Sequence, residues 1–252
     1  MNFNKTKCVE NRWGEASENL KLIATVSCKG VKKKSDPLVV KKEKQVVIFF
    51  IGGAADKNKY FGNGPTNIIR VQVDEVFQKL IDKNNITKEY KSIHIGFDDV
   101  RGDEDIEKNV ISQLSDDKEI GLYIVGHSLG GWNGAHLSRI LSDKGYTIQM
   151  LITLDPVGKG TNTQIISDVY WTTPKPIAKY WINVSTYPES YQSDDFIADL
   201  GGQWNPGTLP QINEICECHH RSAGIMFKKH LKSTNISTLD MLLQNIKLFL
   251  EK

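Results

Sequence analysis

The sequence lacks any apolar run of the roughly 18 residues that a membrane-spanning helix needs. Its first residues, Met1–Lys7, lack the apolar stretch of a secretory signal. We therefore expect a soluble chain that is made in the cytoplasm, with export by a route that reads no signal peptide left open. The formal net charge is only +2, which gives no indication of a nucleic-acid partner.

Cysteine is also scarce, and its spacing matters. The four cysteines, Cys8, Cys28, Cys216 and Cys218, are too few and too scattered for a disulfide framework. A bond between Cys216 and Cys218 would be strained and is not expected in a reducing cytosol. The segment Cys216–His220 holds four potential metal ligands, but a structural zinc site needs a second ligand pair and no second Cys/His cluster exists. We expect no native metal site. A metal site formed by Cys216–His220 is the alternative.

The sequence does contain a regular alternation of short apolar runs with segments of helical spacing. The length of 252 residues, with 39% hydrophobic and 25% charged residues, fits one α/β domain over residues 1–252, with residues 1–19 as a polar tail or irregular lead-in. Short apolar runs predict strands. These runs are Leu20–Cys28, Val46–Ile51, Tyr90–Ile95, Ile120–Val125, Ile148–Leu154 and Trp181–Tyr187.

Helical spacing follows most of the strands. Thr66 is expected to cap a helix, and Asp103 to begin another whose apolar stripe is Ile106, Val110 and Leu114. Two further helices are expected over Gly130–Lys144 and after a cap at Ser237. Strands that alternate with helices predict a mostly parallel central sheet with helices on both faces. The loops 156–178 and 188–218 are long, and long loops in such folds are often functional.

The segment Gly126-His127-Ser128-Leu129-Gly130 fits the pattern G-x-S-x-G. The pattern alone is weak, but here an apolar strand runs into it and a helix runs out of it. That setting is the one that a strand–turn–helix nucleophile elbow requires. The turn is so tight that the residues two before and two after the serine must be small, as Gly126 and Gly130 are. We therefore predict Ser128 to be a nucleophile, with a bystander serine in a glycine-rich turn as the alternative.

The run GHSLGG resembles the nucleophile elbow of lipases in the α/β-hydrolase superfamily, and the resemblance covers the chain from about Val46 onward. It implies an α/β-hydrolase fold and an oxyanion hole made of two backbone N–H groups. One N–H would come from Leu129. The other would come from Gly53 or Ala54, in the loop of small residues after Val46–Ile51; the alternative for that loop is a simple turn.

The superfamily order places the acid after the serine and the histidine last. Asp155, at the end of the strand Ile148–Leu154, resembles the acid of pancreatic-type lipases. Pro156 should restrict it to an extended backbone and hold its carboxylate at the strand tip. Most members carry the acid one strand later, which leaves Asp194 or Asp195, in a polar stretch without a comparable anchor, as alternatives.

Chain order leaves His219 and His220 as candidates for the base, because both lie just before an apolar helical segment. His220 is preferred since it precedes Ala223 in a His-x-x-Ala arrangement that resembles bacterial lipase-like hydrolases, and His219 is the alternate. In the expected geometry, Nδ1 of His220 lies within about 3 Å of the Asp155 carboxylate and Nε2 faces Ser128.

These residues together predict cleavage of carboxylic esters through an acyl-enzyme, without a cofactor. The resemblance favours a lipase or phospholipase, with a thioesterase, acyltransferase or peptidase, or a non-catalytic binding protein of the same fold, as alternatives. The expected partners are a lipid or other ester and a membrane surface. Aromatic residues in the loops either form a lid that meets lipid or pack in the core. These residues are Trp171, Tyr191, Phe196 and Trp204.

Four further segments, GGAADK, YFGNGPT, LDPVG and HHRSA, resemble bacterial lipase-like proteins. Some of those proteins are antibacterial phospholipase effectors of type VI secretion. That resemblance implies a toxin that is exported without a signal peptide and has a cognate inhibitor (immunity) protein.

Overall fold

The computed structural model describes residues 44–54, 56, 64–84, 90–116 and 119–252. All of them belong to one compact unit, Glu43–Lys252. The expected tail over residues 1–19 and the expected strand Leu20–Cys28 lie outside the described residues.

A six-stranded sheet forms the centre of the unit, with the strand order β2-β1-β3-β4-β5-β6 and parallel pairing throughout. The strands are β1 (Lys44–Gly52), β2 (Tyr90–Gly96), β3 (Glu119–His127), β4 (Ile148–Leu154), β5 (Trp181–Thr186) and β6 (Ile212–Cys216). Parallel strands end at the same edge of the sheet, so the loops that follow β1, β3, β4 and β6 meet at that edge.

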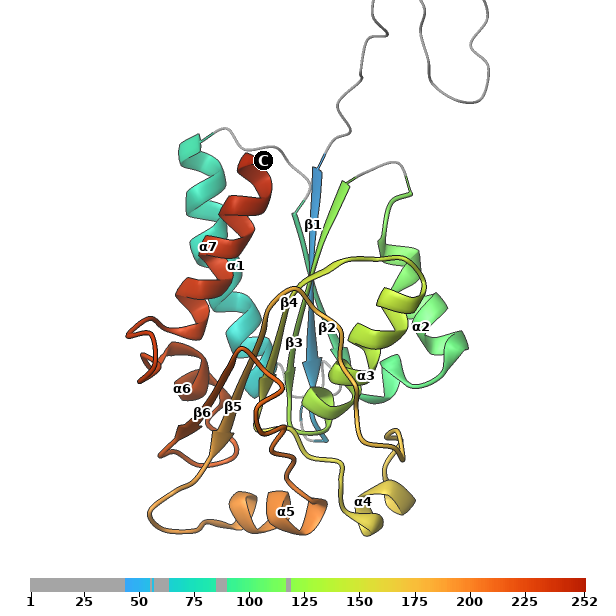
Figure 1. The fold of residues 1–252 in the computed structure, drawn as a ribbon, viewed down its shortest axis with the longest axis vertical. Coiled ribbons are helices and arrows are strands. Elements are labelled where there is room, and N and C mark those ends of the chain that lie inside the picture. The colour runs from blue at the N-terminus through green and yellow to red at the C-terminus, as the bar shows by residue number, and fades with distance from the viewer. Residues whose placement is uncertain (1–43, 55, 57–63, 85–89, 117–118) are drawn as a thin grey trace, which may run out of the picture. The chain divides into compact units, whose positions relative to one another are not determined.

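Helices cover both faces of this sheet (Figure 1), where α1, α6 and α7 lie on one side and α2 and α3 on the other. Two shorter helices, α4 and α5, lie beyond the carboxyl ends of the strands. The helices are α1 (Pro65–Asn84), α2 (Asp103–Asn109), α3 (Leu129–Asp143), α4 (Thr161–Ile166), α5 (Ser193–Gly201), α6 (Ala223–Lys228) and α7 (Thr238–Glu251), with 3-10 turns η2 (Asp98–Val100) and η3 (Ile111–Gln113). No helix among the described residues is both long and apolar enough to cross a bilayer.

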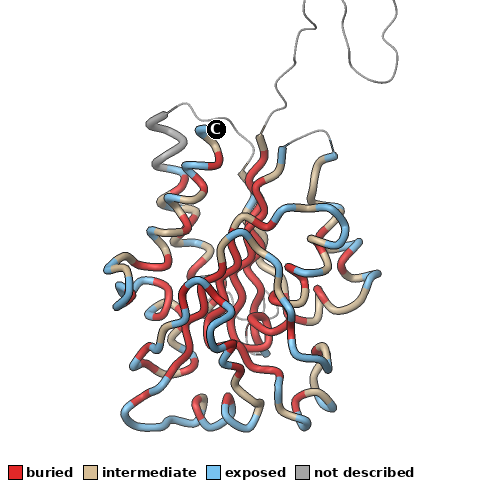
Figure 2. The backbone as a smooth tube through the Cα atoms, viewed as in Figure 1, coloured by how far each residue is buried: buried red, intermediate tan, exposed pale blue. Residues whose placement is uncertain are grey.

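The alternating side chains of β1 explain why this strand is apolar from Val46 to Ile51. Val46, Ile48 and Phe50 point into the core beneath α1, α6 and α7, whereas Val47 and Phe49 point into the core beneath α2 and α3. Buried backbone follows the sheet and the helix faces that cover it (Figure 2). A strand buried on both faces gains from apolar residues at every position.

The expected α/β class, with a parallel central sheet and helices on both faces, is confirmed, whereas the α/β-hydrolase fold in particular stays a prediction. The five strands expected between residues 46 and 187 are all present, with bounds that differ by at most two residues. The long loops are more structured than expected, since 156–178 contains α4, and 188–218 contains α5 and β6. The helix begun by Asp103 is shorter than its apolar stripe, because η3 follows α2, yet Ile106 and Val110 are fully buried.

Helix α1 starts differently from the sequence prediction. Thr66 was expected to cap it, but the hydroxyl of Thr66 has no partner among the described residues. Instead the carboxylate of Asp56 accepts the N–H of Thr66, and the carbonyl of Gly64 accepts the N–H of Ile68. A charged acceptor from the preceding loop is the stronger partner for a free N–H at the positive end of a helix. At α7, by contrast, the cap at Ser237 is confirmed, because its Oγ accepts the N–H of Asp240 at 3.1 Å.

Candidate active site

Ser128 lies in the turn between β3 and α3, in a backbone conformation that non-glycine residues rarely adopt. Its φ is 57° and its ψ is −127°. The N–H of Ser128 donates to the carbonyl of Leu154 at 3.1 Å, and its own carbonyl accepts the N–H of Val157 at 3.0 Å. The turn is thus bonded to β4 and to the loop after it, and these contacts hold a strained conformation of the kind that clusters at functional sites.

The glycines of the elbow are required by close packing of backbone against backbone. A Cβ on Gly126 would overlap the carbonyl of Gly130, and a Cβ on Gly130 would overlap the carbonyl of Ile51. A Cβ on Gly131 would stand 3.0 Å from Pro156. The expectation that the residues two before and two after Ser128 must be small is therefore confirmed.

His220 joins Ser128 and Asp155 in one chain of hydrogen bonds. Its Nε2 lies 2.9 Å from Oγ of Ser128, and its Nδ1 lies 2.6 Å from Oδ2 of Asp155. A carboxylate can only accept, so the imidazole carries its proton on Nδ1 and leaves Nε2 free to accept the serine proton. The expected geometry of these three side chains is confirmed.

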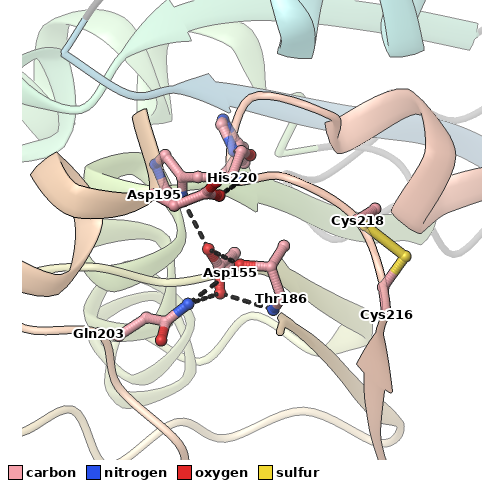
Figure 3. Close-up of a disulfide and its surroundings, with 8 residues drawn as sticks. Asp155, Thr186, Asp195, Gln203, Cys216, Cys218 and His220 are labelled. Atoms are coloured by element: carbon pink, nitrogen blue, oxygen red, sulfur yellow. Dashed lines mark hydrogen bonds and ion pairs between the residues drawn. A yellow bond between two sulfur atoms is a disulfide. The ribbon is translucent and has the colours of Figure 1, made fainter. Parts of the chain in front are cut away.

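Asp155 is completely buried and receives several donors (Figure 3). Besides His220, it accepts the backbone N–H of Thr186 at 2.9 Å, the Thr186 hydroxyl at 2.7 Å and the side-chain amide of Gln203. Thr186 and Gln203 were not singled out in the sequence, since neither belongs to a motif. A buried carboxylate with this many donors is held in one orientation.

The backbone of Asp155 corrects one prediction. Pro156 was expected to keep Asp155 extended, but its φ is +45°. The N–H of Asp155 donates to the carbonyl of Val184 at 2.7 Å, and the donors on its carboxylate fix the side chain as well. These tertiary bonds outweigh the local preference that a following proline imposes.

The alternative acid and base residues meet each other rather than Ser128. Nδ1 of His219 donates to Oδ2 of Asp195 at 2.7 Å, and Oδ1 of Asp195 accepts the backbone N–H of His220 at 2.7 Å. Asp194 accepts the N–H of Arg221 at 3.0 Å. The expectation that these aspartates lack an anchor was wrong, because both lie in the first turn of α5 and Asp195 is buried.

The charge of Asp195 is stabilised by this arrangement. Burial raises the pKa of Asp195, but the N–H groups of Gln192 and His220 and the ring of His219 outweigh burial and lower it. Asp195 is therefore an anion in the folded protein near pH 7.

His127, which directly precedes Ser128 in the elbow, contacts the backbone carbonyl of His220. Nε2 of His127 lies 2.8 Å from the carbonyl oxygen of His220, and the two ring centroids are 4.8 Å apart. Burial, and then the nearby His220, lowers the pKa of His127 to about 4, so it is neutral near pH 7. Chain order only argued against His127 as the base and gave no sign of this contact.

The three expected oxyanion residues lie on two sides of Ser128. Leu129 is the first residue of α3, so its N–H has no partner within the helix. Gly53 packs directly on Ser128, since a Cβ there would stand 2.7 Å from the Ser128 Cβ. Ala54 follows in the same turn, which closes where the N–H of Asp56 donates to the carbonyl of Gly53.

In the Cys216–His220 segment, neither the predicted free cysteines nor the alternative metal site is found among the described residues. Cys216 and Cys218, with Cα atoms 5.3 Å apart, are joined by a disulfide, so the expectation of two free cysteines was wrong (Figure 3). That Cα separation lies within the range that a disulfide spans. His219 and His220 are bonded to Asp195 and Asp155 instead, and no cluster of three or more possible metal ligands is found within the described residues.

The loop aromatics divide between core and surface. Trp204 is buried against Trp132 and Trp181. Trp171, Tyr191 and Phe196 are each more than half exposed. Core packing is therefore found for Trp204, and a lid that meets lipid stays a prediction for the three exposed side chains.

Comparison with known proteins adds little to this geometry. No protein-family model matches the chain, and no curated protein matches it as a relative. Among solved structures, the chain is similar to a metagenomic carboxyl esterase, MGS0156, at 10% identity over 82% of this chain and 75% of that one, with a TM-score of 0.36. Because a TM-score below 0.5 does not establish a common fold, function has to be inferred from the residues of the chain itself.

Proposed function

We propose that the chain is a carboxylic ester hydrolase in which Ser128 is the nucleophile, His220 the general base and Asp155 the acid. The observation that carries the proposal is the continuous chain of hydrogen bonds from Oγ of Ser128 through His220 to Asp155. It is supported by the elbow conformation of Ser128 and by the position of all three residues at the carboxyl edge of the parallel sheet, where open α/β folds bind ligands.

The reaction follows from these positions. Nε2 of His220 takes the proton of Ser128 as Oγ attacks the ester carbonyl, and Asp155 stabilises the resulting imidazolium. The developing oxyanion accepts the N–H of Leu129 and an N–H of Gly53 or Ala54. The alcohol leaves with the proton from His220. Water, deprotonated by His220, then releases the carboxylic acid and regenerates Ser128.

The surface beside this site favours lipid esters over small soluble ones. Five large apolar side chains on α4 and α5 are between 59% and 83% exposed. We call them the α4–α5 apolar face: Ile165, Ile166, Phe196, Ile197 and Leu200. The two helices contact each other, and α5 is bonded to the segment that carries His220. An exposed apolar patch at the edge of a site suits a substrate that lies in an apolar phase.

A basic groove beside His220 indicates which lipid headgroup the site would prefer. The groove, of about 690 Å³, lies between α1 and α6, and its lining contains Arg221, Lys228 and Lys229 with Ile68 and Ile225 and no acidic residue. Arg221 directly follows His220. Cations beside apolar side chains favour an anionic phospholipid over a neutral glyceride, so we propose phospholipase activity as the finer function.

Labelling with a fluorescent fluorophosphonate tests the catalytic proposal. Wild-type protein should label and Ser128→Ala should not, because only an activated serine reacts. Hydrolysis of p-nitrophenyl esters of rising chain length should be lost in the same variant. Labelling of Ser128→Ala at the wild-type rate would refute Ser128 as nucleophile, and absence of labelling in the wild type would favour a non-catalytic binding protein.

A substrate panel tests the finer proposal. Vesicles of phosphatidylglycerol should be hydrolysed faster than vesicles of phosphatidylcholine, and both faster than a triacylglycerol emulsion. The triple variant R221Q/K228Q/K229Q should lose the preference for the anionic vesicles while it still cleaves p-nitrophenyl butyrate. A thioester, peptide or acyl-acceptor substrate that outcompetes all three lipids would instead support a thioesterase, peptidase or acyltransferase at the same residues. Export as an effector, with an inhibitor protein, is a further proposal that toxicity on periplasmic expression would test.

A further inference from the structure

His220 lies on a short connection between β6 and α6 rather than on either element. A side chain on such a connection is positioned only as well as its backbone is. In the structure the backbone of His220 is bonded on both sides, because its N–H donates to Oδ1 of Asp195 at 2.7 Å and its carbonyl faces Nε2 of His127 at 2.8 Å. With Ser128 and Asp155 on the ring, every polar group of His220 has a protein partner.

The contact with His127 has a fixed direction. A carbonyl oxygen only accepts, so Nε2 of His127 carries the proton and donates. Nδ1 of His127 is buried and has no partner among the described residues. A buried acceptor left unpaired is unfavourable, so packing alone gives no reason for a histidine at this position. Its donor to His220 gives one.

Asp195 supplies the opposite contact from a different element. It is the third residue of α5, and its Oδ2 also accepts the N–H of Gln192 at 2.9 Å, which ties the carboxylate to the start of the helix. Asp195 is buried, whereas the neighbouring Asp194 bonds the N–H of Arg221 and does not bond His220. The two aspartates thus differ in which backbone N–H they hold.

We propose that His127 and Asp195 are positioning residues that fix the main chain of His220 from opposite sides, so that its ring stays aligned between Ser128 and Asp155. Neither residue touches the reacting atoms. The inference rests on the proposed function, since it assigns a role to residues around the proposed base. It makes α5 and the elbow turn joint supports of that base, beyond the three residues of the hydrogen-bonded chain.

The central test compares two substitutions at one position. His127→Phe keeps an aromatic ring but loses the donor, whereas His127→Gln keeps an N–H at similar reach. With p-nitrophenyl butyrate, His127→Phe should lower kcat by about 10- to 100-fold with KM changed less than about twofold, as misplacement of a catalytic group does. His127→Gln should recover most of that loss. Equal kcat values in the two variants would overturn the role of the donor.

Asp195 has a matched control in Asp194. Asp195→Asn, which keeps an acceptor for only one of its backbone donors, and Asp195→Ala should lower kcat by about tenfold or more, while Asp194→Ala should stay within about twofold of wild type. Melting temperatures of all variants show whether they fold. If folded Asp195 variants match Asp194→Ala in kcat, Asp195 is not a positioning residue.

A spectroscopic reading separates this inference from the proposed function. The Nδ1 proton of His220, hydrogen-bonded to Asp155, should give a downfield proton resonance in wild-type protein. His127→Phe should broaden or shift that resonance and His127→Gln should preserve it. If Ser128→Ala kept full activity, the proposed function would fail while this spectrum still decided the positioning role; an unchanged resonance in folded His127→Phe would refute that role alone.

Discussion

Gly53 and Ser128 are in direct contact: a Cβ placed on Gly53 would stand 2.7 Å from Cβ and 3.1 Å from Oγ of Ser128. The loop after β1 therefore reaches the nucleophile only because residue 53 has no side chain. Small residues allow backbone N–H groups to come this close to a reacting centre.

Gly53→Ala should lower kcat on p-nitrophenyl butyrate by about a hundredfold or more, since the added methyl displaces either Ser128 or the loop that is proposed to bind the oxyanion. Gly224→Ala is the matched control, because a Cβ there meets nothing within 4 Å. Kinetics of both variants check the expectation. A Gly53→Ala variant as active as Gly224→Ala would remove this loop from the proposed oxyanion hole.

Asp155→Asn should lower kcat by about 10⁴-fold, because an amide favours the wrong tautomer of His220 and cannot balance its positive charge. Thr186 and Gln203 would still be partly satisfied by the amide oxygen, so the variant should fold. The comparison is with Asp195→Asn under the same conditions. A larger loss in Asp195→Asn than in Asp155→Asn would make Asp195 the acid.

His220→Ala should lower kcat by at least about a thousandfold, as loss of the base does in such triads. His219→Ala should be much milder, because the ring of His219 meets Asp195 and not Ser128. Rates with and without a chelator complete the test. The opposite order of the two losses would move the base to His219, and loss of activity on chelation would revive a metal site in Cys216–His220.

Protein stability should fall on acidification partly through His127. Burial lowers the pKa of His127 to about 4 in the folded protein, whereas an unfolded histidine titrates near its reference value of about 6.5. Between these values the unfolded chain binds more protons, so the free energy of unfolding decreases as pH decreases, by at most roughly 1.4 kcal/mol per pH unit for one proton. His136, whose pKa burial also lowers to about 4, adds to the effect.

Urea unfolding of wild-type protein and His127→Gln between pH 7 and 4.5 measures the contribution of His127. The stability of His127→Gln should decrease less steeply with falling pH. Parallel slopes in wild type and His127→Gln would show that His127 does not stay neutral in the folded protein.

The sheet and the elbow were accessible from the sequence because their signals are local. A strand buried on both faces needs a run of apolar residues, such as Val46–Ile51 in β1, and the turn at Ser128 needs glycine at 126 and 130. The contacts of His220 were predicted from the resemblance to lipases, whose order of serine, acid and histidine along the chain was applied to Ser128, Asp155 and His220.

The missed features depend on tertiary contacts. Strand β6 is only five residues long, and its sequence INEIC is neither a continuous apolar run nor a strict apolar–polar alternation, so the sequence gives little sign of a strand. The positive φ of Asp155 and the helix cap by Asp56 both come from partners distant in sequence. The two backbone supports of His220 were not predicted for the same reason, since no sequence spacing relates His127 or Asp195 to residue 220.

The two sides of helix α5, which is nine residues long, make different contacts. Asp195, on its inner side, holds the N–H of His220, and the next two residues, Phe196 and Ile197, belong to the exposed α4–α5 apolar face. Because a helix this short moves as a rigid body, insertion of its outer side chains into a lipid layer cannot tilt it without also displacing the backbone of the proposed base. In the proposed lipid hydrolase, lipid contact at this face and the alignment of His220 would therefore act through the same turn of helix.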